Sequence, residues 1–253
     1  MEFGLKAKEK LVTTGVRSLD AQLGGGTLPG TTLLLLGDPG IGSEVFAHQF
    51  ISGGLENGER AFYFSTDHPI NELRDNMHRL GIDAEKYEKK KKLLFIDAYT
   101  PRFISILPPE LSKEISDKEL LQKGVDSLNQ LKMAIEADYG RKYRGVIDSL
   151  SFFLRSYDVK DVSDAIEIMS SIGKMAGGSH LLLMTRGMHD VATENAMKHI
   201  ADGVIEIFFK ERGSELERLL VVRKMRGMLT PNKMMSFTIG PKGIDLEVMT
   251  RVL

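Results

Sequence analysis

Runs of apolar residues alternate with amphipathic stretches over the first two thirds of the chain. The apolar runs have strand length and lie at residues 31–38, 60–66, 92–99, 143–150 and 179–185. Unbroken runs of this kind are typical of parallel strands that are buried on both faces. Helical spacing of apolar positions separates them, most clearly at residues 71–81, 120–137 and 161–178. This alternation predicts an α/β fold, with a mostly parallel central sheet flanked by helices.

In the last third of the chain, the pattern of apolar and polar positions no longer alternates between strands and helices. Closely spaced strand-like segments follow one another at residues 202–211, 217–227, 234–243 and 244–249. Strands joined by short turns form antiparallel hairpins, so we expect a C-terminal antiparallel β-meander that extends the sheet. The methionines of this region are expected to pack inside the meander, namely Met225, Met228, Met234 and Met235.

Glycine, proline and charge mark further boundaries. Three glycines should stop a short helix at residues 18–23, and Gly53 with Gly54 should end the helix that follows Gly42 after about three turns. Residues 99–118 are rich in proline and polar side chains and predict a long surface loop. The charge run EKYEKKKK before the third strand is expected to be a solvated helix end or loop.

Composition narrows the classes of protein that need to be considered. The length of 253 residues suits one large α/β domain over residues 1–253. With 34 basic and 35 acidic residues, the chain has no global field that would attract nucleic acid or an anionic membrane, so neither is expected as a partner. The absence of cysteine excludes disulfides and thiolate chemistry. Without a signal-like N-terminus or a membrane-length apolar run, a cytoplasmic location is expected.

A glycine-rich turn follows the first apolar run, in the sequence LLLLGDPGIGSEVFAHQF. Gly37 and Gly42 have the spacing of a phosphate-binding loop, in which backbone N–H groups cradle phosphates, a lysine adds positive charge and a hydroxyl binds Mg²⁺. Here Ser43 occupies the lysine position and Glu44 the hydroxyl position. The loop alone is compatible with a nucleotide site, with the remains of one, or with an unrelated glycine turn.

Asp148 supplies the context that favours a phosphate loop. It ends the apolar run GVID, at the place where P-loop proteins hold the carboxylate that helps to bind Mg²⁺. An Asp at the end of a strand is commonly only a helix cap or turn residue. Together with the glycine turn, however, Asp148 becomes a candidate metal-site residue.

Several segments resemble the RecA-like ATPases of the KaiC, GvpD and RadA group, above all single-domain archaeal KaiC-like proteins, and they follow one another in the same order as in that family. The matching segments are TTGVRSLDAQLGGGTLPGTTLLLLGDPGIG, FYFSTDHP, LLFIDAY, GVIDSLSFFL, HLLLMT, ADGVIEI and VVRKMRGM. They span nearly the whole chain, which makes an unrelated glycine turn a poor explanation. The resemblance implies a RecA-like P-loop fold, ATP bound at a subunit interface, and ring-shaped homo-oligomers that are commonly hexamers.

The resemblance also assigns site residues one by one. The nucleotide-binding positions are Gly37, Asp38, Pro39, Gly40, Ile41, Gly42, Ser43, Glu44 and Asp148. Asp67 and His68 align with the paired glutamates that polarise the attacking water in relatives, so only a shorter carboxylate is left. Thr185 takes the place of a polar sensor residue. Lys224 and Arg226 match the K-x-R pair that relatives extend to the nucleotide of a neighbouring subunit.

The exchange of lysine for a carboxylate argues against an ordinary nucleotide site. One pair of unit charges at about 4 Å and an effective dielectric near 20 is worth roughly 4 kcal/mol, about half the free energy of a micromolar complex. We therefore expect weak or absent binding of ATP or ADP with Mg²⁺, although the backbone cradle remains and Glu44 is able to bind Mg²⁺ beside Asp148. Hydrolysis is not expected, because the lysine is missing and the paired glutamates are replaced by Asp67 and His68.

The leading hypothesis is a KaiC-like, oligomer-forming regulatory or scaffolding subunit without ATPase activity. Lys224 and Arg226 are then either ordinary solvated residues or act in trans within a mixed ring that contains an active paralogue. One alternative is an ATPase with a non-standard loop that uses Glu44, Mg²⁺ and a lysine from elsewhere. Another is a RadA-like accessory protein in DNA recombination or repair.

The remaining candidates point to no further chemistry. His48 is expected to be a packed or surface side chain, and His180, His189 and His199 lack the spacing of a zinc site. Residues 185–199 lie where DNA-handling relatives carry a DNA-binding loop. Because Arg186 and Lys198 are offset there by acidic residues, a solvated loop is expected.

Overall fold

The computed structural model describes residues 10–103, 126–137, 139–140, 142–231 and 233–247. The strands are β1 (Thr32–Gly37), β2 (Arg60–Ser65), β3 (Leu93–Asp97), β4 (Tyr143–Asp148), β5 (Ser179–Thr185), β6 (Gly203–Arg212), β7 (Glu215–Met225), β8 (Met235–Gly240) and β9 (Gly243–Leu246). The helices are α1 (Arg17–Gln22), α2 (Ser43–Glu56), α3 (Ile70–Arg79), α4 (Ala84–Lys89), α5 (Thr100–Phe103), α7 (Ser127–Glu136), α8 (Leu150–Ser156), α9 (Val159–Ala176) and α10 (Val191–Ile200).

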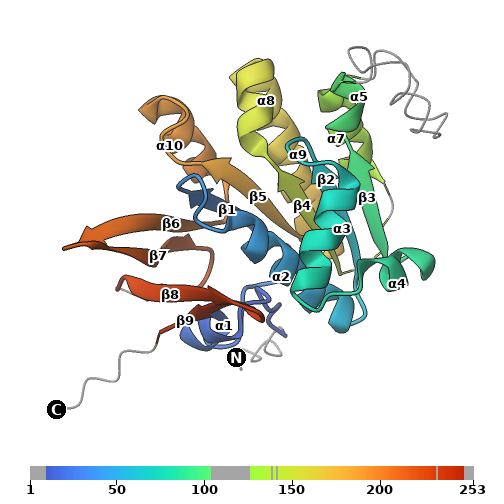
Figure 1. The fold of residues 1–253 in the computed structure, drawn as a ribbon. Helices are drawn as coiled ribbons and strands as arrows, with labels where there is room; N and C mark the ends of the chain where they lie inside the picture. Colours follow the sequence, from blue (N-terminus) through green and yellow to red (C-terminus); the bar gives the residue numbers. More distant parts are fainter. Residues whose placement is uncertain (1–9, 104–125, 138, 141, 232, 248–253) are drawn as a thin grey trace, which may run out of the picture.

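The strands form one sheet in the order β3-β2-β4-β5-β1-β6-β7-β8-β9. Strands β1 to β6 pair in parallel, and β6 to β9 pair antiparallel. Figure 1 shows the antiparallel part as an orange-to-red succession, β6 to β9, with the red β8 and β9 beside the blue α1. The expected α/β fold with a C-terminal antiparallel meander is confirmed.

Register brings the ends of the central strands together. The last residue of β1, Gly37, lies opposite Thr185 of β5 and Ile207 of β6. Ser65 of β2 lies opposite Asp148 of β4. Because the strands are parallel, the loops that leave their carboxyl ends gather at one edge of the sheet, where open α/β folds bind ligands.

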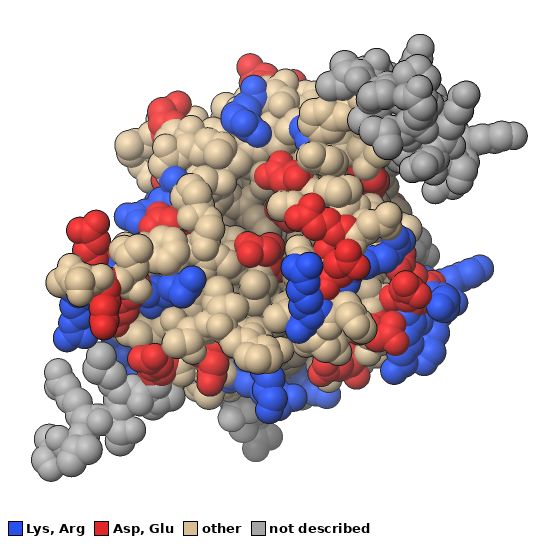
Figure 2. Space-filling model, in the orientation of Figure 1, with Lys and Arg blue, Asp and Glu red and all other residues tan. Residues whose placement is uncertain are grey.

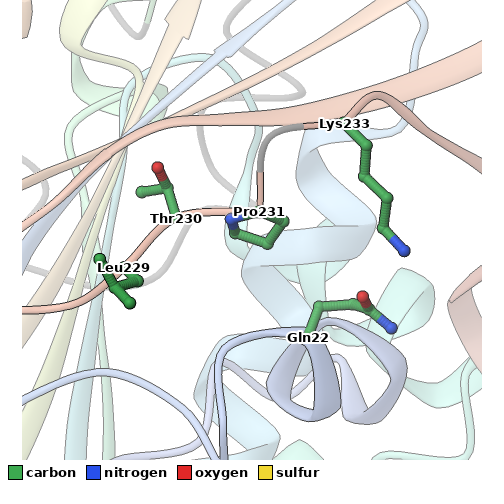
Figure 3. A pocket seen from close by; sticks show the side chains of 5 residues that line it. All are labelled: Gln22, Leu229, Thr230, Pro231 and Lys233. Atoms are coloured by element: carbon green, nitrogen blue, oxygen red, sulfur yellow. The ribbon is translucent and has the colours of Figure 1, made fainter.

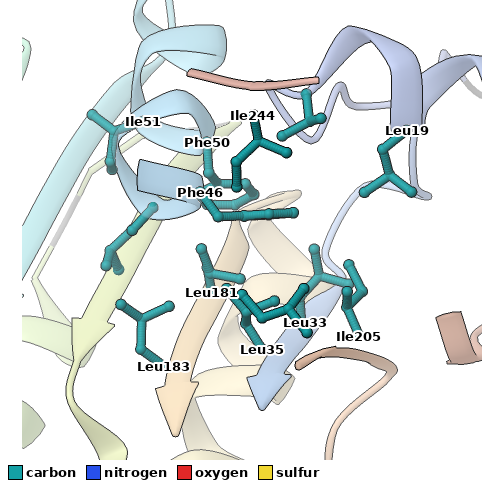
Figure 4. Packing of buried hydrophobic residues seen from close by; sticks show 14 of the residues in the cluster. Leu19, Leu33, Leu35, Phe46, Phe50, Ile51, Leu181, Leu183, Ile205 and Ile244 are labelled. Atoms are coloured by element: carbon teal, nitrogen blue, oxygen red, sulfur yellow. The ribbon is translucent and has the colours of Figure 1, made fainter. Parts of the chain in front are cut away.

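Two apolar layers cover the sheet. On one face, Phe46 and Phe50 of α2 pack over Leu33, Leu35 and other strand residues (Figure 4). On the other face, α7, α8 and α9 cover the alternate residues of the strands, including Leu34, Leu36 and Phe64. Burial on both faces explains why the central strands are continuous apolar runs in the sequence.

Helix α2 does not end at its glycines, contrary to the expectation from sequence. It continues through Gly53 and Gly54 to Glu56. A Cβ on Gly54 would lie 2.4 Å from Nε of Arg144, and one on Gly53 would lie 3.1 Å from the Cα of Gly15. These glycines are therefore required for close packing inside the helix, where they do not act as a stop signal.

Two helices differ from the predictions. Residues 149–150, assigned to a strand, instead begin α8, because the Ser149 side chain accepts a hydrogen bond from the Phe152 N–H and caps the helix. The expected solvated loop at residues 185–199 is wrong from Val191 onward, where α10 forms. Asp190 caps that helix by accepting from the Thr193 N–H, and Met197 is buried beneath it.

The expectations for smaller features have mixed outcomes. Met225 and Met235 are buried in the meander and Met228 packs against the core, but Met234 is 54% exposed and does not pack inside. The charged run at residues 85–92 forms the solvated helix α4 and the turn after it. The predicted loop at residues 99–118 begins with α5, while residues 104–118 and the expected helix start at residues 120–125 lie outside the described residues.

The face seen in Figure 2 carries charges of both signs. Figure 2 shows acidic and basic side chains interspersed over the visible face. Within the described ranges, no helix combines the length and the apolar character that crossing a membrane requires.

Candidate functional site

The turn between β1 and α2 has the shape of a phosphate loop. Gly40 and Gly42 have φ of 74° and 104°, a conformation that favours glycine, and Gly42 caps α2. A Cβ on Gly37 would lie 2.3 Å from Oγ of Ser43, so the two ends of the loop touch. The chain therefore folds the loop tightly around the beginning of α2.

Backbone N–H groups of this loop are free to receive an anion. The Ile41 N–H donates to the Asp38 carbonyl at 3.2 Å. In the described part of the chain, the N–H groups of Gly40, Gly42, Ser43 and Glu44 have no hydrogen-bond partner. Free N–H groups and the positive end of the helix dipole form an anion site.

Acidic side chains surround the position where a lysine and a hydroxyl would otherwise stand. Glu44 has no ion pair or hydrogen bond among the described residues, and its charge acts on both Tyr63 and Asp148. Asp67 acts on the same two groups. Three carboxylates from α2, β4 and the turn after β2 thus converge beside the loop.

Asp148 is the most strongly perturbed of these carboxylates. It is buried, and its Oδ2 accepts a hydrogen bond from the Tyr63 hydroxyl at 2.8 Å. The pKa of Asp148 is raised to about 6, chiefly by burial and also by the negative charges of Asp67 and Glu44, while the Tyr63 hydrogen bond and the charge of His68 oppose the rise. Burial beside these carboxylates also raises the pKa of Tyr63 well above its ordinary value.

Asp67 and His68 follow β2 but face different partners. Oδ2 of Asp67 accepts from the Ser149 hydroxyl at 2.7 Å, which holds Asp67 next to Asp148. His68 lies at the rim, where its Nδ1 is 3.1 Å from Oε1 of Glu72. The structure therefore holds Asp67 in the acidic cluster and places His68 at the edge of that cluster, where its charge lowers the pKa of Asp148.

His48 lies one helical turn after Glu44 on α2. Its ring is buried, with no hydrogen-bond partner for either nitrogen in the described part of the chain, and lies 5.9 Å from the ring of Tyr63. Burial lowers the pKa of His48 to about 4, with a smaller contribution from His68. His48 is therefore a neutral, packed side chain near neutral pH, one of the two places expected for it.

Thr185 and Arg186 close the other side of the loop. Thr185 ends β5 beside Gly37, and its N–H donates to the Ser151 hydroxyl at 2.9 Å. The N–H of Arg186 donates to the Gly37 carbonyl at 2.8 Å, and its guanidinium lies 3.3 Å from Oδ1 of Asp38. Sequence reasoning treated Arg186 only as a loop charge, although its place directly after Thr185 on the neighbouring strand was a usable signal.

Lys224 and Arg226 are engaged within their own chain. The Lys224 ammonium donates to the carbonyls of Lys198, His199 and Ala201 at the end of α10, at 3.3, 2.9 and 2.7 Å. The Arg226 guanidinium donates to the Pro29 carbonyl at 2.9 Å and faces Asp202 at 3.6 Å. Their predicted role toward a neighbouring subunit stays a prediction.

Arg102 is a further cation at this edge that sequence reasoning missed. Its guanidinium stacks over Phe152 at 4.2 Å and donates to the Thr66 carbonyl. Burial lowers the pKa of Arg102, while the charge of Asp67 opposes that effect. No local pattern in the sequence predicts this contact, because Arg102 follows β3, whereas Thr66 follows β2 and Phe152 lies in α8.

Cavities elsewhere carry less chemistry. A pocket of about 420 Å³ lies between α1 and the chain after β7, where the Gln22 and Lys233 side chains face the same space (Figure 3). A larger groove of about 740 Å³ lies near the carboxyl end of α2 and the β8–β9 turn. In the portion of the chain that is described, no group of three or more His, Asp or Glu side chains is arranged to hold a metal ion.

Comparison with known proteins gives consistent matches. A family model described as the KaiC ATPase matches residues 12–250. A UPF0273 protein of Pyrococcus furiosus is 30% identical over 92% of both chains, and one of Aeropyrum pernix is 31% identical over the same shares. The crystal structure of a KaiC-like protein from Pyrococcus horikoshii is similar with a TM-score of 0.69 and 28% identity, covering 94% of this chain and 99% of that one.

Proposed function

Because this chain belongs to the KaiC family of ATPases, we propose that it is a member that binds nucleotide weakly or not at all and does not hydrolyse it. On this proposal it acts as an oligomer-forming regulatory or scaffolding subunit. The observation that carries the proposal is the charge beside the loop. Glu44, Asp67 and Asp148 converge there, and Ser43 stands where a lysine would neutralise phosphate.

Electrostatics supports weak binding. The raised pKa of Asp148, at about 6, reflects burial and uncompensated negative charge even without a ligand. A triphosphate would add further negative charge at the same place, opposed only by backbone N–H dipoles and nearby cations. Each uncompensated pair of unit charges at contact costs roughly 4 kcal/mol at an effective dielectric near 20.

A magnesium ion would reduce this repulsion. Asp148 and Glu44 are the residues that would hold it, together with phosphate oxygens and water, because Mg²⁺ usually takes only one or two protein carboxylates. The free Glu44 carboxylate fits that role, whereas one Asp148 oxygen is already bonded to Tyr63. The ion would supply positive charge between the carboxylates and the phosphates.

The geometry also supports the absence of hydrolysis. A hydrolysing site needs a carboxylate free to orient the attacking water. Asp67 is held by the Ser149 hydroxyl, and His68 is paired with Glu72 at the rim. Neither side chain is placed as a free base over the loop.

The repair variant Ser43→Lys with Glu44→Thr tests this function. We expect calorimetry to give micromolar or tighter Mg-ATP binding for the repair variant, and at least about tenfold weaker binding for the wild type. The matched control is Ser52→Lys with Glu56→Thr, which makes the same changes at the other, exposed end of α2. Equal affinities for the wild type and the repair variant would contradict the charge argument.

ATP turnover by the wild type that Asp148→Ala abolishes would instead favour the alternative of a working ATPase.

The oligomer is tested separately. We expect sedimentation to give a homo-oligomer, or co-assembly with an intact relative into a mixed ring. The exposed Leu229 and Met234 that follow the K-x-R pair support an interface there. A strictly monomeric protein that leaves the relative's ATPase unchanged would contradict this part of the proposal.

A further inference from the structure

Arg186 is a cation in direct contact with the β1–α2 loop. Its backbone N–H is bonded to Gly37, the first loop residue, and its guanidinium contacts Asp38, the second. The register of β1 with β5 fixes this position, because Gly37 lies opposite Thr185. The side chain therefore begins at the wall of the loop itself.

We propose that Arg186 is the phosphate-binding cation of this site, in place of the missing loop lysine, and that the ligand it recognises is a diphosphate or triphosphate group. The inference rests on the proposed function, since it concerns the weak site that remains. A guanidinium forms paired hydrogen bonds with phosphate oxygens, so it suits an anion that the free loop N–H groups already hold.

The present partner of Arg186 is one that phosphate can replace. The pair with Asp38 is exposed, with side-chain exposures of 44% and 25%, and exposed ion pairs contribute little to stability. Asp38 keeps a second bond when Arg186 leaves, because its Oδ2 accepts from the Phe209 N–H at 2.8 Å. The guanidinium also lies over the ring of Phe208, 5.0 Å from its centre, a contact that leaves its N–H groups able to bind an anion.

The other cations singled out above are less available. Arg102 is stacked on Phe152 and bonded to the Thr66 carbonyl. Lys224 is surrounded by three carbonyls of α10, and Arg226 is bonded to Pro29. Arg186 is thus the one among these four whose only polar side-chain partner is a residue of the loop.

Calorimetry with pyrophosphate and with ADP tests the assignment on the full chain. We expect Arg186→Gln to weaken both ligands by at least about tenfold, the usual size of a lost charged hydrogen bond. The matched control is Arg218→Gln, because Arg218 stacks on the neighbouring Phe209 at 5.4 Å but has no contact with the loop. The control should bind as the wild type does. Thermal unfolding of each variant checks that the fold is retained.

Asp38→Asn provides a readout that a merely structural ion pair would not give. The amide oxygen still accepts from Phe209, but the competing charge is gone, so pyrophosphate should bind severalfold tighter. This gain should vanish when Arg186→Gln is added. Wild-type affinity in Arg186→Gln, or no pyrophosphate binding by the wild type up to about 10 mM, would overturn the inference and leave the proposed lack of hydrolysis intact. ATP turnover by the wild type would overturn the proposed function alone.

Discussion

Strand β4 carries a buried charge at each end, and the two charges differ in how many partners they have. At the beginning of the strand, Arg144 is fully buried and its Nε pairs with Glu59 at 2.8 Å. Its Nη1 donates to the carbonyls of Thr13 and Phe50 at 2.8 and 2.7 Å. At the end of the strand, the Asp148 carboxylate accepts one hydrogen bond among the described residues, from Tyr63, and two further carboxylates lie nearby.

The difference separates an end of the sheet where a buried charge is paired from the end that carries the candidate site. Arg144 joins the N-terminal segment, α2 and the turn before β2, and an opposite charge balances it. Asp148 lies where like charges accumulate and, among the described residues, forms no ion pair, which costs stability in the absence of a ligand. Perturbed, under-compensated groups of this kind are typical of binding sites.

The largest effect is expected for Arg144→Met, which would remove the buried cation that pairs with Glu59 at the beginning of β4. The variant leaves Glu59 and two carbonyls without their partner, so we expect a loss of about 3 to 5 kcal/mol in the free energy of unfolding. Urea denaturation measures it. Arg74→Met is the control, since Arg74 makes a similar pair with Glu88 on the surface and should cost no more than about 1 kcal/mol. Equal losses would show that burial does not distinguish the two arginines.

The second prediction concerns the unbalanced end, where Asp148→Asn should stabilise the protein at pH 7. The folded pKa of about 6 exceeds the ordinary value of 3.8, so the folded state holds the proton more tightly and loses stability as pH rises from 4 to 6. Asparagine removes this loss, which amounts to at most about 3 kcal/mol, while its oxygen still accepts from Tyr63. The gain should disappear near pH 4.

Denaturation of both proteins at pH 7 and at pH 4 measures this effect. Asp202→Asn serves as the control, because Asp202 is also buried but faces Lys174 at 3.0 Å and Arg226 at 3.6 Å. The control should be destabilised at pH 7. An Asp148→Asn variant that is less stable than the wild type at pH 7 would refute the view that this end is under-compensated.

The smallest effect is expected for Lys224→Met, which tests a balanced charge near the surface. Its ammonium contacts the last carbonyls of α10, and such contacts at a helix end contribute about 1 kcal/mol. Lys210→Met on the exposed part of β6 is the control and should change the unfolding free energy by less than about 0.5 kcal/mol. A Lys224→Met variant that matches this control would show that the contact adds nothing.

The parallel sheet was well predicted from the sequence. Its strands are buried on both faces, so each one is a run of consecutive apolar residues. Residues 179–185, for example, were assigned to the strand with the bounds that β5 has. Local rules failed where tertiary packing decides, as at Gly53 and Gly54, which fit against Gly15 and Arg144 inside a helix. They also failed at α10, where the charged residues that indicated a loop are the residues that cap and brace a helix.

The site was predictable only in part. Loop spacing and strand ends were enough to place Gly37, Asp148 and Thr185 at one edge of the sheet. The contacts of Tyr63 with Asp148 and of Arg186 with Asp38 join residues that are far apart in the chain. Such pairs leave no local signature, so a single sequence does not reveal them.

Helix α10 has a consequence of its own. It buries one residue, Met197, whereas α9 buries a whole face. Besides the partly buried Ala196 and Ile200, polar contacts hold it: Glu194 accepts from the Gly187 N–H at 2.7 Å, and Lys198 lies 3.2 Å from Glu206. Ionic strength weakens such contacts but hardly affects apolar burial. We therefore expect added salt to loosen α10, and because α10 follows the Arg186 turn, we expect ionic strength to reach the β1–α2 loop through this helix.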